Sequence, residues 1–294
     1  MQQHLIARED RVDSFGMLLK QWRARRNFSQ LDLALSSEVS QRHISFLESG
    51  RAKPSQAMVL QLATVLEIPL RQQNLLLSAA GFAPIHTETD LSAPEMAPVR
   101  KAIDLMLHKH EPYPAFAVDR YWNLLLTNKG ATRLLDAFIA SEKLHRLFYT
   151  DGKINLLRVM FHPQGLRPFM VNWESIASHT LQRLHREMLV ERESDLSTVL
   201  MNELMSYPDV ARIWQIDRDR AEHTLLLNTH FKREELELKF FSTIATLGTP
   251  DDITLQELRL ECLFPADETT EHNWQQLSET KVSASDALSA TQTN

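Results

Sequence analysis

From Phe15 to Leu77 the apolar residues recur every three or four positions with short interruptions, the spacing of helices that bury one face. This pattern predicts about five helices and no strand. Gly81 follows the last apolar stripe as a C-terminal stop, and residues 83–98 carry three prolines among Thr, Ser and acidic residues, a composition typical of a linker. We therefore expect an all-α domain over residues 1–82 and a linker over residues 83–97.

The second part of the chain mixes two periods. Helices are predicted over residues 97–110, 129–139, 172–190 and 196–216. Strands are predicted within residues 113–127, where Pro112 and Pro114 disfavour a helix, and over the β-rich residues 224–231, 236–247 and 255–264. These elements predict an α/β domain over residues 98–270 that ends in an antiparallel sheet. The Ser-, Thr- and Ala-rich residues 275–294 are expected to form a disordered tail.

The third predicted helix has the character of a DNA-reading helix. Ser40 can cap its start, and Ile44 and Leu47 form its inward face. Gln41, Arg42 and Ser45 are thereby left on the outer face. A helix fits the major groove of B-DNA, where Gln can pair with adenine and Arg with guanine, so Gln41 and Arg42 are the candidates for direct base readout.

Other residues around this helix are candidates for phosphate contacts. Gln30 and Ser40 stand at the starts of the second and third helices, where backbone and side-chain donors can take a phosphate. Arg51 and Lys53 follow the third helix. These contacts would set register and salt dependence rather than sequence preference. The alternative for this region is a helical protein-interaction module that never touches DNA.

These positions resemble the Xre/Cro helix-turn-helix family. The matching residues are Ser29-Gln30, Leu33-Ala34, Val39-Ser40, Ile44-Ser45, Glu48, Gly50-Arg51 and Pro54-Ser55. The resemblance implies double-stranded DNA as partner, and because one such unit contacts few bases, a homodimer on paired half-sites is expected. One departure is Glu38, which stands in the turn where the family usually has glycine; a left-handed backbone there would cost about 1 kcal/mol.

Charge and composition agree with a regulator in the cytoplasm. Residues 1–80 hold ten basic and seven acidic residues, whereas the remainder holds 22 and 31, so a mildly basic head precedes an acidic body. No run of eighteen apolar residues and no apolar signal core appears, so a cytoplasmic protein without a membrane partner is expected. Cys262 is the single cysteine, and no Cys/His set has metal-ligand spacing, so neither an internal disulfide nor a metal is expected.

The order of elements after residue 98 resembles a PAS-like sensor, and more closely the ligand-binding domain of MmyB-like regulators. The residues that carry this resemblance are Pro114-Ala115, Trp122, Leu125, Asn128, residues 155–157, Phe161, Trp173, Tyr207-Pro208, Val210, Ile213, Trp214, His230, Glu235-Leu236, Leu238 and Phe240. After His230 this chain has Phe231-Lys232-Arg233-Glu234 where the family usually shows Pro-Glu-Val-Gly. The resemblance implies a pocket for a small apolar ligand, with fatty acids as the known class, and no other cofactor.

Such a pocket needs an apolar lining and a polar anchor for a carboxylate. The candidate lining residues are Tyr113, Phe116, Trp122, Met160, Phe161, Phe169, Trp173 and Phe240. Arg120, Arg158 or His162 could supply the anchor. The alternative is that these aromatic residues form plain core, and Asn128 is interpreted as a cap for the helix that starts at Lys129 rather than as a ligand contact.

Enzymatic motifs are absent from the sequence. There is no Gly-x-Ser-x-Gly elbow, Gly-rich phosphate loop or His-Glu-x-x-His, and the chain has only seven glycines. The sequence therefore predicts a non-enzymatic, DNA-binding transcription regulator whose second domain senses a small apolar ligand. The alternative keeps the DNA-binding head but makes the second domain a dimerisation or protein-partner module without ligand.

Overall fold

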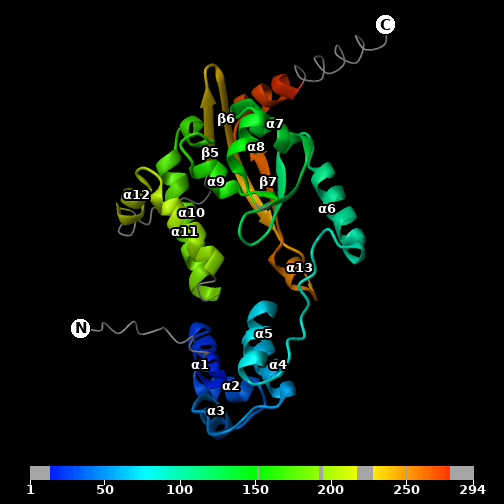
Figure 1. Cartoon of the computed structure of the whole chain (residues 1–294), viewed down its shortest axis with the longest axis vertical. Helices are drawn as coiled ribbons and strands as arrows, with labels where there is room; N and C mark the ends of the chain where they lie inside the picture. Colours follow the sequence, from blue (N-terminus) through cyan, green and yellow to red (C-terminus); the bar gives the residue numbers. More distant parts are fainter. Residues whose placement is uncertain (1–13, 151, 192–194, 217–227, 249, 279–294) are drawn as a thin grey trace, which may run out of the picture. The chain divides into compact units, whose positions relative to one another are not determined.

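The computed structural model describes residues 14–278 with the exception of residues 151, 192–194, 217–227 and 249 (Figure 1). The chain divides into two compact units. The first contains the described residues up to 90 together with residues 250–256, and the second contains the described residues of 91–248 and of the chain from 257 onward. The predicted linker of residues 83–97 thus contributes to both units.

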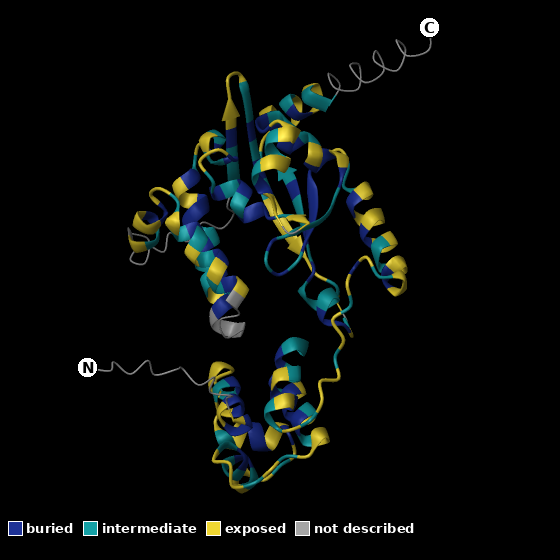
Figure 2. Cartoon of the chain, in the orientation of Figure 1, coloured by how far each residue is buried: buried dark blue, intermediate teal, exposed yellow. Residues whose placement is uncertain are grey.

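Residues 14–80 fold into the five helices that the apolar spacing predicts. They are α1 (Phe15–Arg25), α2 (Gln30–Ser36), α3 (Gln41–Glu48), α4 (Gln56–Val65) and α5 (Leu70–Ala79). The first four helices begin after a serine whose side-chain oxygen accepts a backbone N–H of the first turn. Their apolar stripes face a common core that includes Leu19, Leu33, Ile44 and Leu62. Exposed residues lie on the outer sides of these helices (Figure 2).

Two backbone positions fix how α1, α2 and α3 meet. Gly16 lets α1 lie against the end of α3, because a Cβ at this position would stand 2.5 Å from the carbonyl oxygens of Leu47 and Glu48. Glu38, in the turn between α2 and α3, has φ +54°, so it adopts the left-handed backbone for which the family usually has glycine. The turn and the close helix contact together position α3.

The second unit is a mixed α/β domain. Its helices and 3-10 turns are η1 (Pro94–Met96), α6 (Ala97–Lys109), α7 (Lys129–Phe138), α8 (Ser141–Phe148), α9 (Leu156–Phe161), η2 (Arg167–Phe169), α10 (Trp173–Glu191), α11 (Asp195–Ser206) and α12 (Val210–Ile216). Its strands are β1 (Ala115–Val118), β2 (Leu124–Thr127), β3 (Tyr149–Thr150), β4 (Lys153–Ile154), β5 (Asn228–Arg233), β6 (Leu236–Ala245) and β7 (Arg259–Pro265).

Among the described residues of this unit, five strands form one sheet in the order β2-β1-β7-β6-β5, and every neighbouring pair is antiparallel. The predicted antiparallel sheet is therefore confirmed. Phe116 of β1 pairs with Glu261 of β7, and Phe240 of β6 pairs with Pro265, which puts these side chains on one face of the sheet. Phe116 and Phe240 on that face belong to a core shared with α7, α9 and α10.

Some predicted boundaries differ from the structure. The predicted helix over residues 196–216 is interrupted between α11 and α12, where Pro208 precedes Asp209 with φ +63°. The predicted strand over 255–264 begins only at Arg259, because α13 (Ile253–Glu257) occupies its first residues. Of the predicted strand over residues 224–231, the first four lie outside the described residues.

The C-terminal end of the described chain is helical. Residues 268–278 form a helix on which Trp274 is fully buried, and the Trp274 Nε1 donates to the Pro112 carbonyl oxygen at 3.0 Å. The expected tail of residues 275–294 therefore begins inside this helix, while residues 279–294 lie outside the described residues.

Candidate functional site

The outer face of α3 carries the residues expected to read bases. Ser40 caps the helix, its hydroxyl oxygen accepting the His43 backbone N–H at 3.2 Å. Gln41 and Arg42 in its first turn are exposed, and Ser45 one turn later is half-buried. The buried Ile44 and Leu47 hold the opposite face in the core. The helix therefore exposes Gln41 and Arg42 on one face while its opposite face is packed in the core.

Arg42 and Arg51 share a neighbour that sequence reasoning missed. The Arg42 guanidinium lies 5.2 Å from the centre of the Phe46 ring, and the Arg51 guanidinium lies 5.9 Å from the same ring. Cations within about 6 Å of an aromatic face are attracted to it. Phe46 thus holds both arginines on one side of α3; the spacing of four residues between Arg42 and Phe46 is the signal that could have found it.

Gln30 is held against α3 by a polar network. Its Nε2 donates to Glu48 Oε2 at 2.8 Å, and the same carboxylate accepts two bonds from Arg23, at 2.5 and 3.0 Å. The pKa of Arg23 is raised above its ordinary value, first by the hydrogen bond to Glu48. Arg23 also donates to the Phe28 carbonyl oxygen at 2.8 Å. The start of α2 and the end of α3 are therefore tied to α1, which helps to fix the direction in which α3 points.

The remaining phosphate candidate, Lys53, is exposed in the loop between α3 and α4, as is Arg51. The structure thus places Gln41, Arg42, Arg51 and Lys53 within one continuous stretch of the first unit, on α3 and the loop that leaves it. Three of these four side chains are cationic, the type that contacts phosphate and guanine.

In the second unit, most candidate lining residues meet in one apolar cluster. Phe116, Trp122, Phe161, Trp173 and Phe240 are all buried members of it, and Tyr113, Met160 and Phe169 pack against its margin. Phe161 and Trp173 contact edge to face, with ring centres 4.9 Å apart. Tyr113 also donates its hydroxyl to Glu271 at 3.0 Å.

The two arginines expected to anchor a carboxylate are both in ion pairs. Arg120 is buried and donates to Glu257 at 2.9 Å. Arg158 is bound to Glu203, with Nη2 2.8 Å from the carboxylate, and the Tyr207 hydroxyl donates to the same group at 3.0 Å. Burial, followed by this hydrogen bond to Glu203, raises the pKa of Tyr207 to about 12. An anionic ligand would have to compete with a protein carboxylate at either arginine.

A third arginine adjoins the cluster and was not found from sequence. The Arg183 guanidinium of α10 lies 4.8 Å from the ring centre of Trp122, and its Nε donates to Glu187 at 3.0 Å. Trp122 has φ +65° and thus a left-handed backbone in the turn between β1 and β2. Residues this far apart in sequence leave no spacing signal, which explains why the pattern did not find Arg183.

Asn128 is a structural residue, as interpreted from sequence. Its Oδ1 accepts the backbone N–H groups of Ala131 at 2.8 Å and Ala115 at 2.9 Å. Its Nδ2 donates to the carbonyl oxygens of Tyr113 and Leu107 at 2.8 and 3.2 Å. The side chain caps α7 and joins it to β1 and α6.

Among the described residues, no group of three His, Cys, Asp or Glu side chains is arranged to hold a metal ion. No helix in that part of the chain is both long and apolar enough to cross a membrane.

Comparison with known proteins decides the family. The model described as MmyB-like transcription regulator ligand binding domain matches residues 99–277. The chain belongs to this MmyB-like family. A second family model, described as helix-turn-helix, matches residues 19–73, which include α2 and α3. This MmyB-like protein is therefore a DNA-binding transcription regulator with a ligand-binding domain, and neither family is one of enzymes.

Other comparisons add little to this assignment. No curated protein matches the chain. Among solved structures, it is similar to one titled "Structure of an RNA-binding Light-Oxygen-Voltage Receptor", with 10% sequence identity and a TM-score of 0.26. The match covers 93% of this chain and 64% of that chain.

Proposed function

We propose that this regulator acts as a cytoplasmic homodimer that reads a specific operator with Gln41 and Arg42, and that its second domain binds a small apolar ligand of the fatty-acid class. The observation that carries the first part is the α3 surface, where Gln41 and Arg42 are exposed over a helix whose other face is fixed in the core. Arg51 and Lys53, with Gln30 and Ser40, contribute phosphate contacts in this proposal.

The proposed dimer follows from the size of the reading surface. One helix offers Gln41, Arg42 and Ser45 to the bases, and such a unit reads only a few base pairs. Two heads on half-sites about one helical turn apart supply the affinity that specific regulators need.

The proposed ligand class is supported by the apolar cluster and its adjoining arginines. A fatty acid needs an apolar channel for its tail and a cation for its carboxylate. The cluster around Trp122, Phe161 and Trp173 supplies the apolar surface. Arg120 and Arg158 remain anchor candidates, and Arg183 joins them because it stacks on Trp122.

A second candidate function is favoured by the ion pairs themselves. Arg120 and Arg158 each have a glutamate partner, and the aromatic residues pack on one another. A domain packed in this way could serve dimerisation or a protein partner without any ligand.

The DNA-reading role is tested with Arg42→Ala in the full chain, on an operator selected from genomic fragments and on random DNA. Loss of a guanine contact costs about 1–3 kcal/mol at one base position, so affinity for the operator should fall about tenfold or more while random DNA is little affected. The control is Arg146→Ala, which removes an exposed cation of α8. Equal losses on both DNAs would assign Arg42 to phosphate instead.

The ligand is tested by native mass spectrometry of the purified protein, followed by titration with palmitate and with hexadecanol. Fatty-acid binding with an arginine anchor predicts that palmitate binds more tightly than the alcohol of equal length. Arg120, Arg158 and Arg183 are each replaced by Gln in separate variants. Replacement of the arginine that anchors the carboxylate should remove the preference for palmitate and leave hexadecanol binding unchanged, with Arg146→Gln as the control. A protein that binds neither compound and carries no apolar molecule would favour the dimerisation module.

A further inference from the structure

The chain enters the first unit twice. Residues 250–256, which we call the return segment, lie in sequence between β6 and β7 of the second unit but belong to the first unit. β6 ends at Ala245 and β7 begins at Arg259. Both strands lie inside the sheet and carry core residues, Phe240 on β6 and Leu263 on β7. The return segment is thus continuous at both ends with the ligand-binding domain's central strands.

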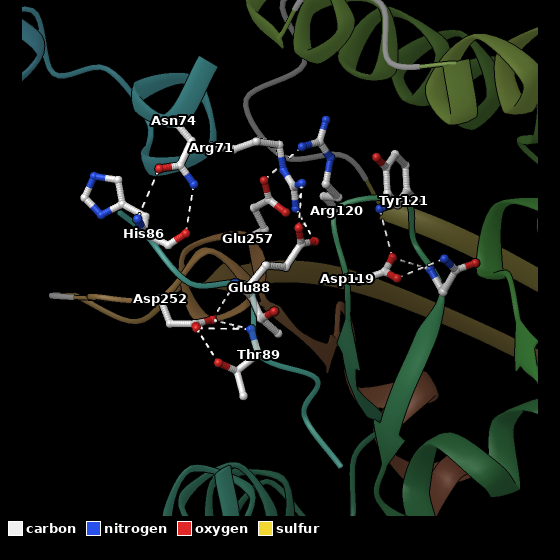
Figure 3. Close-up of polar contacts among 12 residues, drawn as sticks. Arg71, Asn74, His86, Glu88, Thr89, Asp119, Arg120, Tyr121, Asp252 and Glu257 are labelled. Atoms are coloured by element: carbon white, nitrogen blue, oxygen red, sulfur yellow. Dashed lines mark hydrogen bonds and ion pairs between the residues drawn. The ribbon is translucent and has the colours of Figure 1, made fainter. Parts of the chain in front are cut away.

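Asp252 attaches the return segment to residues 87–89 of the first unit. The buried Asp252 carboxylate accepts hydrogen bonds from the hydroxyls of Thr87 and Thr89, both at 2.8 Å, and from the Thr89 backbone N–H at 3.1 Å (Figure 3). The next residue, Ile253, is also buried and donates its backbone N–H to the Thr87 carbonyl oxygen at 2.9 Å. Hydrogen bonds to an ionised carboxylate are stronger than those between neutral groups, so Asp252 is the main attachment point.

Gln256 attaches the same segment to a helix of the DNA-binding head. α5 begins after Pro69, which provides no side-chain cap. Gln256 Oε1 instead accepts the backbone N–H of Leu70, the first residue of α5, at 2.8 Å. The first N–H groups of a helix lack partners within the helix, so this bond supplies a cap from the return segment. α5 in turn places Leu76 and Leu77 in the core of the head.

Residues 85–89 are themselves fastened to α5. Asn74 accepts the backbone N–H of His86 at 3.1 Å and donates to the His86 carbonyl oxygen at 2.8 Å (Figure 3). It also accepts the backbone N–H of Ile85 at 3.1 Å. Arg71 and Glu88 form a bidentate ion pair. The expected linker is therefore hydrogen-bonded along this stretch to α5, and Asp252 is bonded to the fastened part.

The segment is also held where it leaves the first unit. Glu257, which follows Gln256 and already belongs to the second unit, pairs with the buried Arg120 just after β1. Two consecutive residues thus bind different units. Gln256 binds the start of α5, and Glu257 binds Arg120 just after β1.

We propose that the return segment transmits the ligand state of the sheet to the DNA-binding head. A ligand that alters the position of β6 or β7 changes the Asp252 attachment and the Gln256 cap on α5, and thereby the affinity for DNA. This inference rests on the proposed regulatory function. Coupling of this kind requires that the ligand bind two states of the sheet with different affinities and that the head sense which state is present.

The link is tested first without ligand, by hydrogen exchange on the full chain. Asp252→Ala should accelerate exchange of residues 85–90 and of the first turn of α5 about tenfold, whereas Asp251→Ala, at the exposed neighbour, should not. This step alone would also follow from a purely structural role. The decisive variant is therefore Phe240→Leu, which loosens β6 within the second unit; Leu263→Ala on β7 replaces it if that variant fails to fold.

Transmission predicts that loosening the strand accelerates exchange of residues 85–90 about tenfold when Asp252 is present, and adds nothing in the Asp252→Ala chain. Unchanged exchange of residues 85–90 in both strand variants, or effects that simply add, would overturn the proposal. Exchange of α7 amides serves to verify that the second unit remains folded.

The second arm measures DNA affinity with and without palmitate. Asp252→Ala should bind palmitate as the original protein does but lose most of the palmitate-dependent change in DNA affinity, and Asp251→Ala should keep it. A palmitate response that survives Asp252→Ala would contradict the proposal. If palmitate has no effect on the original protein, the proposed ligand is wrong, while the exchange experiment still decides whether the segment transmits.

Discussion

Several residues have left-handed backbone conformations that are unfavourable for residues other than glycine. Glu38 is the one in the turn before the DNA-reading helix α3. Its φ of +54° costs a non-glycine residue about 1 kcal/mol. Glu38→Gly should raise the free energy of unfolding of the head by up to about 0.5 kcal/mol, since the strain removed is at least as large as the entropic cost of glycine, about 0.5–1 kcal/mol. Hydrogen exchange of the core amides of the head measures it. Ser36→Gly, at an exposed helical position of α2, should shift stability the opposite way.

Asn128 shows how a single side chain can join three elements of the second unit. Asn128→Asp keeps the acceptor for Ala115 and Ala131 but sets a carboxylate against the carbonyl oxygens of Leu107 and Tyr113. We expect this change to lower the stability of the second unit by about 3 kcal/mol, measured by differential scanning calorimetry. Part of the loss should return at low pH, because a protonated carboxyl can donate to one carbonyl. Asn202→Asp, at an exposed site of α11, is the control; equal losses in both variants would refute this account.

At the scale of elements, the contact of α1 with α3 depends on the missing side chain of Gly16. In an exposed helix Gly→Ala stabilises by about 1 kcal/mol, but here the new Cβ would lie 2.5 Å from two backbone oxygens. Gly16→Ala should therefore destabilise the head by about 1–3 kcal/mol and weaken DNA binding through the displaced α3. Thermal unfolding and DNA titration measure both effects. Gly248→Ala, where nothing lies within 4 Å of the added Cβ, should leave both unchanged.

The attachment of the return segment depends on the charge of Asp252. Burial alone would raise the pKa of Asp252, but hydrogen bonds from Thr87, Thr89 and the Thr254 backbone outweigh it, so the pKa lies below its ordinary value. A depressed folded pKa means that the contribution is complete above the unfolded pKa and is lost as the pH falls through the folded value. Burial lowers the pKa of the nearby His86 below its ordinary value, and Glu88 is paired with Arg71.

Exchange of residues 85–90, corrected for its intrinsic pH dependence, should therefore rise as the pH falls through the low pKa of Asp252. Asp252→Asn should show faster exchange with no such rise. The same pH profile in both proteins would mean that another group controls this segment.

At the scale of the whole molecule, local sequence patterns were sufficient to predict the elements whose structure is determined by their own residues. The first four head helices have serine caps, all five have apolar stripes, and Ile44 with Leu47 determined which face of α3 is outward. The strands of the sheet followed from alternation and from Pro112 and Pro114. Residues 255–257 did not: their apolar alternation resembles the start of a strand, but they end the short helix α13, which follows the bonds of Asp252 to Thr87 and Thr89 and belongs to the first unit as far as Gln256. Contacts across such sequence distances leave no local signal, as Arg183 on Trp122 also illustrates.

The unequal charge of the two halves and the proposed dimer lead to one prediction for the intact protein. Each phosphate contact contributes about 0.9 to the slope of log affinity against log salt. Removal of one contact from each of two heads should lower that slope by about 1.8, against about 0.9 for a single head. Lys53→Ala in the full chain, titrated on operator and on random DNA at several salt concentrations, measures the difference. Lys101→Ala, an exposed cation of α6 outside the DNA-binding unit, should leave the slope unchanged. A change near 1.8 supports two heads on one site, a change near 0.9 supports one, and no change would remove Lys53 from the DNA interface.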